Sequence, residues 1–265
     1  MSHSLASWLV ASLAVLAFAC STSPTGRRRL VIFSDAQMSQ MGITAFDELK
    51  KGTPTSRDSR AQGYVRCVAD AIAREITTPG APRSWEVVVF QDDSANAFAL
   101  PGGKIGVHTG IFQVARNQDQ LAAVIGHEVA HVLAGHSNER ASTQLATEGA
   151  LGALDALSGP ASPAKSRTLA VLGVGAQVGV LLPFSRAQES EADVLGLDLM
   201  ARAGFDPRQG SALWENMAKL GGQPPEILST HPSSATRIQG LRDRVPTALP
   251  LYDRARASGK QPSCG

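Results

Sequence analysis

The spacing of apolar residues along the chain predicts several helices. Over residues 58–76 and 121–136, apolar side chains recur every three or four positions, which places them on one face of a helix. Capping residues and chain breakers predict the remaining helices and their ends. Helices are expected over residues 35–51, 58–76, 121–136, 137–157, 186–203, 206–220 and 230–244, with an irregular tail after residue 246.

Three shorter stretches have the composition of strands. Residues 85–90 are rich in β-branched and aromatic side chains, residues 30–33 predict a brief strand, and residues 96–108 predict two strands joined by a Pro-Gly-Gly turn. Because a proline is confined to the edge or end of a strand, the first of these two strands is expected at the sheet edge, where it could pair with an extended peptide. The residues expected to pair in this way are Asn96, Ala97, Phe98 and Ala99.

The order of these elements predicts one α+β domain over residues 30–265. It is expected to be mostly helical, with a small mixed sheet whose edge strand lies beside the helix at residues 121–136. An uncharged stretch, residues 168–185, could contact a membrane or form a buried helix hairpin. Its glycines weaken a spanning helix, so the buried hairpin is the preferred interpretation.

The N-terminal residues resemble an export signal. The first 19 residues contain no Asp, Glu, Lys or Arg, and an apolar run ends in small residues before Cys20. This pattern predicts a lipoprotein-type signal peptide over residues 1–19, lipidation of Cys20 and a linker over residues 20–29. An ordinary cleaved signal and an uncleaved anchor are the alternatives. The expected location is the periplasmic face of the outer membrane, with a soluble periplasmic protein as the alternative.

The composition and net charge of the chain limit which kinds of binding partner are expected. The chain is 43% hydrophobic and 18% charged, which is typical of a globular protein, and a net charge of +2 gives no electrostatic case for nucleic acid. The basic run Arg27–Arg29 is expected to be a solvated linker, although it could also lie near anionic lipid head groups. If Cys20 is lipidated, Cys67 and Cys264 remain, and two cysteines in an exported protein predict a disulfide.

The pattern H-E-x-x-H supplies the candidate chemistry. On a helix, His127 and His131 lie one turn apart on the same face, within reach of a single ion, and two imidazoles suit Zn²⁺. Glu128 is rotated about 100° from His127, beside the ion, where a base for a metal-activated water must stand. His136 lies about 140° around the helix from His131 and is therefore interpreted as structural.

A third ligand is expected in the helix over residues 186–203. Glu189 and Asp193 share one face, so Glu189 could bind the metal while Asp193 accepts the outer N–H of a ligand histidine. Glu191 is about 200° away from Glu189 on the helix and cannot share this role, so Glu189 is preferred over Glu191 as the ligand.

Four motifs occur in this order along the chain: the string from Asn96 to Gly103, H-E-x-x-H at residues 127–131, E-x-x-x-D at residues 189–193, and Thr230-His231-Pro232 with Arg237. The combination resembles the zinc metallopeptidase family that includes HtpX, the CAAX prenyl endopeptidase, BepA and LoiP, with the exported LoiP-like members nearest. The resemblance implies a gluzincin-type arrangement and one Zn²⁺ per chain. It also makes His231 either a fourth ligand in a closed site or a donor to the tetrahedral intermediate, and gives Arg237 the role of holding this segment or stabilising the oxyanion. The implied zinc ligands are His127, His131 and Glu189, and the implied base is Glu128.

The expected function is therefore zinc-dependent endopeptidase activity. The resemblance points to unfolded or extended polypeptides as substrates, in particular misfolded or unassembled cell-envelope proteins, and to the envelope assembly machinery as a partner. The rival is a periplasmic chaperone or assembly scaffold whose zinc site is mostly closed. A purely structural zinc site would leave Glu128 without a role.

Overall fold

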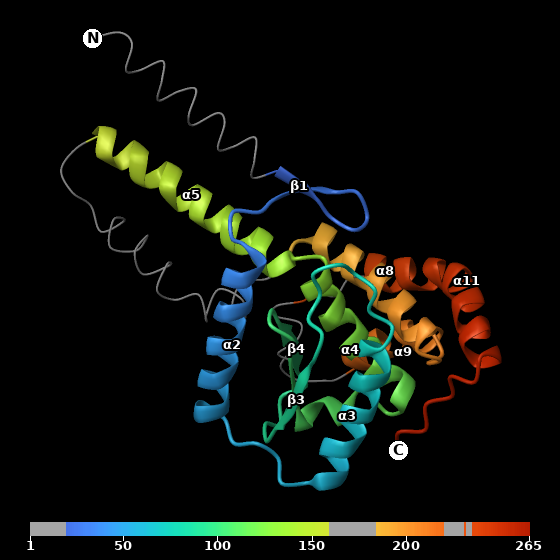
Figure 1. Ribbon diagram of the computed structural model, residues 1–265. Helices are drawn as coiled ribbons and strands as arrows, with labels where there is room; N and C mark the ends of the chain where they lie inside the picture. Colours follow the sequence, from blue (N-terminus) through green and yellow to red (C-terminus); the bar gives the residue numbers. More distant parts are fainter. Residues whose placement is uncertain (1–19, 159–183, 220–230, 232–234) are drawn as a thin grey trace.

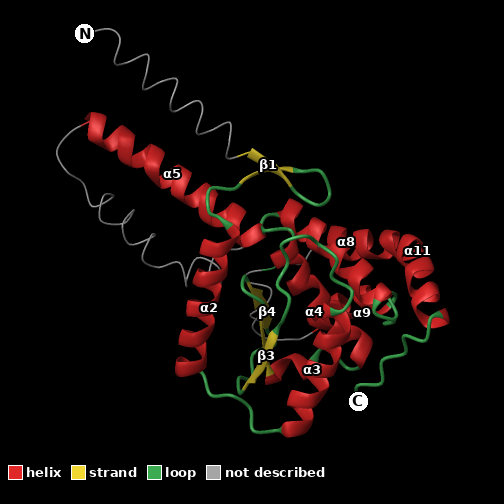
Figure 2. Ribbon diagram, viewed as in Figure 1, coloured by secondary structure: helices red, strands yellow, loops and turns green. Residues whose placement is uncertain are grey.

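The computed structural model describes residues 20–158, 184–219, 231 and 235–265 (Figure 1). Helices dominate these ranges and a small mixed sheet lies among them (Figure 2), so the predicted α+β class is confirmed. The predicted signal peptide and all but the last two residues of the uncharged stretch 168–185 lie outside the described residues. Among the described helices, none has both the length and the apolar character that a membrane span requires.

The sheet has three strands, and the predicted edge strand is at its edge. The strands are β3 (Glu86–Phe90), β4 (Ala97–Leu100) and β5 (Lys104–His108), in the order β3-β5-β4. The central strand β5 is parallel to β3 and antiparallel to β4, with Ala97 opposite Val107. Gly102 and Gly103 turn the chain between β4 and β5 with φ of 85° and 73°, a conformation that favours glycine.

One helix lies at the centre of the main core. Helix α4 contacts four other helices, α3, α5, α8 and α9, and the strands β4 and β5 (Figure 1). Leu121 and Ile125 of α4 are completely buried. A smaller apolar cluster around Phe46 packs α2 against the sheet. The helices are α2 (Asp35–Gly52), α3 (Ser59–Ala73), α4 (Gln118–Leu133), α5 (His136–Ser158), α8 (Arg186–Arg202), α9 (Gln209–Lys219) and α11 (Ala235–Ala257), and a 3₁₀ turn η1 (Thr109–Gln113) precedes α4.

Local chemistry moves several helix ends from their predicted positions. The helix predicted over residues 121–136 ends at Leu133, because Gly135 has a φ of 66° and turns the chain before α5 begins. Helix α2 begins at Asp35 as predicted, and its N-cap is Ser34, which forms a reciprocal capping box with Gln37.

The irregular tail predicted after residue 246 is wrong. Helix α11 continues to Ala257 and contains both Pro246 and Pro250. Each proline removes one helical hydrogen bond, but both prolines are exposed, so water can satisfy the freed carbonyl groups. Ala248 and Ala255 of the same helix are buried, and this packing helps to offset the hydrogen bonds that the prolines remove.

The segment expected to be a solvated linker is an ordered hairpin. Strands β1 (Cys20–Thr22) and β2 (Arg28–Leu30) pair antiparallel, and the strand predicted over residues 30–33 ends at Leu30. Gly26 turns the chain with a φ of 91°. The basic side chains have partners on the body: Arg29 donates to the Ala134 carbonyl and Arg27 pairs with two carboxylates. These acceptors, which are distant in sequence, explain why charge patterning alone suggested a solvated segment.

Cys67 of α3 and Cys264 are joined by a disulfide with an S–S distance of 2.11 Å and a Cα–Cα distance of 5.5 Å. This is the pair that the cysteine count singled out. Gln118 at the start of α4 also holds the segment, because it donates to the Pro262 carbonyl and accepts from the Cys264 N–H. The residues after α11 are thereby fixed against α3 and α4.

Candidate metal centre

Two glycines let the helices that carry the motifs approach closely. A Cβ atom on Gly126 of α4 would lie 2.8 Å from the carbonyl oxygen of Gly196 on α8, and a Cβ on Gly196 would lie 2.7 Å from the backbone nitrogen of His127. Neither position can carry a side chain without a backbone shift. The contact sets the distance between the H-E-x-x-H motif and the carboxylates of α8.

Four side chains from three parts of the chain meet at this crossing. His127 Nε2 lies 3.0 Å from His131 Nε2 and 3.3 Å from His231 Nδ1. The carboxylate of Glu189 lies 2.9 Å from His231 Nδ1, 3.4 Å from His127 Nε2 and 3.5 Å from His131 Nε2. A tetrahedral zinc site with ligand bonds of about 2.0–2.1 Å has ligand atoms about 3.3–3.4 Å apart. The separations and the three-nitrogen, one-carboxylate donor set therefore fit such an ion, and all four residues are buried.

Glu128 lies beside this cluster with one oxygen unused. Its side chain is buried, and among the described residues no group hydrogen-bonds to its Oε1, which lies 3.6 Å from His231 Nε2. Burial raises the pKa of the Glu128 carboxyl, and the nearby His231 and His127 offset this only in part. A carboxylate with a raised pKa is a better proton acceptor near neutral pH.

Asp193 and Arg237 hold the ligands in place. Asp193 Oδ1 lies 3.0 Å from His127 Nδ1, which turns the other ring nitrogen of His127 toward the cluster. Arg237 donates to both oxygens of Asp193, at 2.8 and 2.7 Å, and its third nitrogen lies 2.5 Å from Glu189 Oε2. The guanidinium also stacks 4.0 Å from the ring centre of Trp214. Because its guanidinium binds the carboxylates of Asp193 and Glu189, Arg237 is placed to orient these two side chains. This arrangement favours the predicted role of holding the site together over that of stabilising an oxyanion.

A second pair of residues reaches the cluster from the other side. His136 Nδ1 lies 2.9 Å from His131 Nδ1, and His136 Nε2 lies 3.2 Å from Glu191 Oε2. Neither contact was foreseen. Helical geometry excluded both residues as ligands, but the turn at Gly135 redirects the chain and places His136 beside the outer nitrogen of His131.

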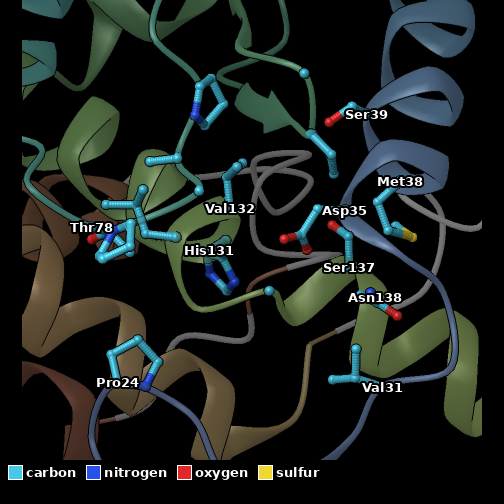
Figure 3. A pocket seen from close by; sticks show the side chains of 18 of the residues that line it. Pro24, Val31, Asp35, Met38, Ser39, Thr78, His131, Val132, Ser137 and Asn138 are labelled. Carbon is cyan, nitrogen blue, oxygen red and sulfur yellow. The ribbon is translucent and has the colours of Figure 1, made fainter. Parts of the chain in front are cut away.

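A cavity of about 560 Å³ opens beside the cluster (Figure 3). His131 and Val132 of α4 form one wall, and Asp35 and Met38 of α2 lie across from them. The cavity also reaches Pro101, directly after the edge strand β4. A ring lies over the imidazoles as well: the Phe184 ring centre is 3.8 Å from that of His131.

The structure thus brings together every residue that the sequence motifs nominated for the metal centre. The edge strand with Asn96 to Ala99 packs against α4, and among the described strands only β5 pairs with it. The site residues that sequence reasoning missed are Gly126, Phe184 and Glu191, together with the contact role of His136. A glycine directly before the H-E-x-x-H motif was the one visible signal for a close helix crossing.

Comparisons with known proteins agree with this geometry. The model of peptidase family M48 matches residues 59–245. The chain is 42% identical over 167 residues to the mitochondrial metalloendopeptidase OMA1 of Schizosaccharomyces pombe, covering 62% of this chain and 48% of the relative. It is 36% identical over 247 residues to the mitochondrial metalloendopeptidase OMA1 of Danio rerio, covering 87% and 51%. It is 30% identical over 228 residues to the beta-barrel assembly-enhancing protease of Escherichia coli K12, covering 82% and 46%.

The chain spans about half the length of each of these relatives. The family model, by contrast, covers well over half of this chain and includes both helices that carry the H-E-x-x-H and E-x-x-x-D motifs. The special closeness to LoiP that the motifs suggested stays a prediction, because these relatives do not test it. The chain belongs to peptidase family M48.

Proposed function

We propose that the chain is a zinc-dependent metalloendopeptidase. The observation that carries the proposal is the buried cluster of His127, His131, Glu189 and His231, whose atoms have the mutual distances of a tetrahedral site, with the unused carboxylate oxygen of Glu128 beside it. The names of the relatives support a peptidase over the chaperone alternative.

Each residue has a distinct role in this proposal. His127, His131 and Glu189 would hold the ion. A bound zinc ion supplies positive charge that acidifies a water molecule and polarises the scissile carbonyl. Glu128 accepts the proton of that water and delivers it to the leaving amine, for which its raised pKa suits it. Asp193 keeps the His127 ring oriented throughout.

His231 takes the fourth position in the arrangement described here. Catalysis needs one open position, so we infer that this arrangement is a resting state and that His231 must move before substrate reacts. From a displaced position, its Nε2 could donate a hydrogen bond to the developing oxyanion. Replacement of His231 by Ala should therefore weaken zinc binding and also lower kcat. Zinc affinity and activity that both equal those of the wild type would refute this role.

The substrate is proposed to be an extended polypeptide. β4 lies at the edge of the sheet over the proposed pairing residues 96–99, and because Asn96 hydrogen-bonds to β5 and the pattern alternates, the N–H and C=O groups that point away from β5 are those of Ala97 and Ala99. The cavity of Figure 3 is lined by His131 and also by Pro101, which directly follows this strand. A chain paired with β4 would lie near this cavity, which His131 of the cluster lines. Folded proteins do not present such a strand, so unfolded or unassembled proteins are the fitting substrate class.

The location follows from the N-terminal sequence. Lipidation at Cys20 after an apolar signal would place the domain on the periplasmic face of the outer membrane, with a soluble periplasmic form as the alternative. The name of the beta-barrel assembly-enhancing protease supports an envelope location and an assembly-machinery partner, whereas the OMA1 relatives are named as mitochondrial.

The decisive experiment compares the wild type with Glu128→Gln. Metal content would be measured by elemental analysis and peptidase activity by cleavage of unfolded casein. We expect about one zinc per chain in both proteins and loss of at least about a hundredfold in cleavage rate in the variant, the scale of a lost general base. Casein cleavage by Glu128→Gln at a rate near that of the wild type would overturn the mechanism, and absence of metal in the wild type would overturn the site.

A further inference from the structure

A chain of hydrogen bonds leads from the metal centre to the N-terminal hairpin. It starts at His131 Nδ1, which lies 2.9 Å from His136 Nδ1, and continues from His136 Nε2 to Glu191 Oε2 at 3.2 Å. The side chains of His136 and Glu191 are 0% and 2% exposed. The chain is therefore shielded from water, and each group in it depends on its protein neighbours.

The positions of the protons along this chain follow from one requirement. His131 can hold an ion through Nε2 only if that nitrogen is unprotonated, so the ring proton must be on Nδ1 and must be donated to His136 Nδ1. His136 then carries its own proton on Nε2 and donates it to the Glu191 carboxylate. In this arrangement His131 donates to His136 and His136 donates to Glu191, so every hydrogen bond along the chain runs in the same direction.

The hairpin fixes Glu191 at the end of the chain. Thr25 donates to Glu191 Oε1 through its backbone nitrogen at 3.2 Å and its hydroxyl at 2.8 Å. Arg27 donates to Glu191 Oε2 through Nε at 3.2 Å and Nη2 at 3.1 Å. Along another edge of the guanidinium, Nη1 and Nη2 of Arg27 donate to the two oxygens of Glu139 at 2.5 and 2.6 Å. Every group named here that contacts the two oxygens of Glu191 is a hydrogen-bond donor, so the carboxylate serves only as an acceptor.

We propose that Glu191 and His136, held in place by the N-terminal hairpin, orient the His131 ring and fix its tautomer. The inference rests on the metal binding proposed above. Without an acceptor beyond His136, that imidazole could carry its proton on Nδ1. Two N–H groups would then face each other in a buried place, and the unsatisfied donor would disfavour the metal-binding form of His131.

A merely structural role is the alternative, in which these residues do no more than attach the hairpin. Glu139 separates the two interpretations, because it binds Arg27 at least as closely as Glu191 does but makes no hydrogen bond to His136 among the described contacts. Arg28 supplies a second comparison. It lies next to Arg27 on the same hairpin and is exposed, so its replacement tests whether any change of charge on the hairpin alters zinc affinity.

The test measures zinc dissociation constants by competition with a chelator for the wild type, Glu191→Gln, Glu139→Gln and Arg28→Gln. In Glu191→Gln the amide oxygen can accept from His136 only if the N–H₂ group is turned toward the Thr25 backbone N–H, and the opposite orientation turns N–H₂ toward His136 and Arg27. Either orientation therefore places two donors against each other and weakens the chain of hydrogen bonds. We expect Glu191→Gln to bind zinc about 10–100 times more weakly than the wild type, the usual effect of losing such a partner. Glu139→Gln and Arg28→Gln should stay within about threefold of the wild type.

A second readout needs no variant. In the zinc-loaded wild type, ¹⁵N chemical shifts of the imidazoles should show the proton on Nδ1 of His131 and on Nε2 of His136. A proton on His136 Nδ1, or equal zinc affinities of Glu191→Gln and Glu139→Gln, would overturn the inference. Failure of the wild type to bind zinc would instead overturn the proposed function, so the two failures are distinguishable.

Discussion

Replacement of Gly196 by Ala should damage the metal centre through the backbone rather than through any ligand. The added Cβ would lie 2.7 Å from the His127 nitrogen, 2.8 Å from the Gly126 carbonyl carbon and 2.9 Å from the His127 Cα. All three are backbone atoms, so no side-chain rotation can relieve the clash. Ordinary contact begins near 3.4 Å, so α4 and α8 must separate by about 0.7 Å.

That displacement exceeds what the centre tolerates. Glu189 moves with α8, while His127 and His131 move with α4, and ligand distances in metal sites hold to about 0.2 Å. We expect the zinc dissociation constant to rise at least tenfold and the free energy of unfolding to fall by about 1–3 kcal/mol, the usual cost of overpacking. Chelator competition gives the first quantity and urea unfolding the second.

The matched control is Gly63→Ala. Gly63 lies in α3, and a Cβ there would meet nothing within 4 Å. This variant should bind zinc as the wild type does and gain up to about 1 kcal/mol from helix propensity. If Gly196→Ala kept wild-type zinc affinity, the helix crossing would not set the ligand geometry.

Three further predictions follow from the same structure. Asp193→Asn should weaken zinc binding about 10–100-fold, because a neutral amide orients the His127 ring less well than a carboxylate does. The zinc dissociation constant would be measured by chelator competition, and a value equal to that of the wild type would contradict the prediction. Zinc binding should depend on pH: burial would lower the pKa of His127, but Asp193 and Glu189 outweigh it and raise it to about 9 in the metal-free protein. Zinc must displace that proton, so zinc affinity should rise about tenfold for each pH unit between pH 7 and 8.5. Calorimetry in buffers of different ionisation enthalpy should count one proton released for each zinc ion bound. Zinc affinity that does not change over this pH range would refute the prediction. Cys67→Ser should lower the free energy of unfolding by up to about 5 kcal/mol in urea, given a separation of 197 residues in the chain-entropy model, whereas a midpoint equal to that of the oxidised wild type would contradict it.

Much of the architecture was accessible from residue patterns, and the exceptions have physical causes. The apolar period located α4, and four-residue spacing placed Glu189 and Asp193 on the face that meets His127, because both patterns are local. The ends of α4 and α11 were missed for different reasons. Gly135 ends α4 through a backbone conformation that periodicity does not encode, and tertiary packing carries α11 past two prolines.

The partners of the N-terminal hairpin could not be foreseen for a related reason. A run of arginines with no nearby acids looks solvated, yet the carboxylates that bind Arg27 are 112 and 164 residues away in the sequence. Helical angles placed Glu191 away from the face that carries Glu189, but they do not show what lies on the opposite face of α8. Only the fold places His136 there.

The fixed segment after α11 has a bearing on self-digestion. Residues without regular structure are where peptidases usually cut, because they can be drawn out as a strand. Here the disulfide to α3 and two hydrogen bonds with the Gln118 side chain, one donated by it and one accepted from the Cys264 N–H, hold such a stretch against the body. While the cysteines are oxidised, the residues between α11 and Cys264 are therefore held back from pairing as a strand with another copy. Reduction would detach this stretch from α3, so under the proposed peptidase activity the oxidised cysteine pair would protect residues 258–264 from cleavage by another copy.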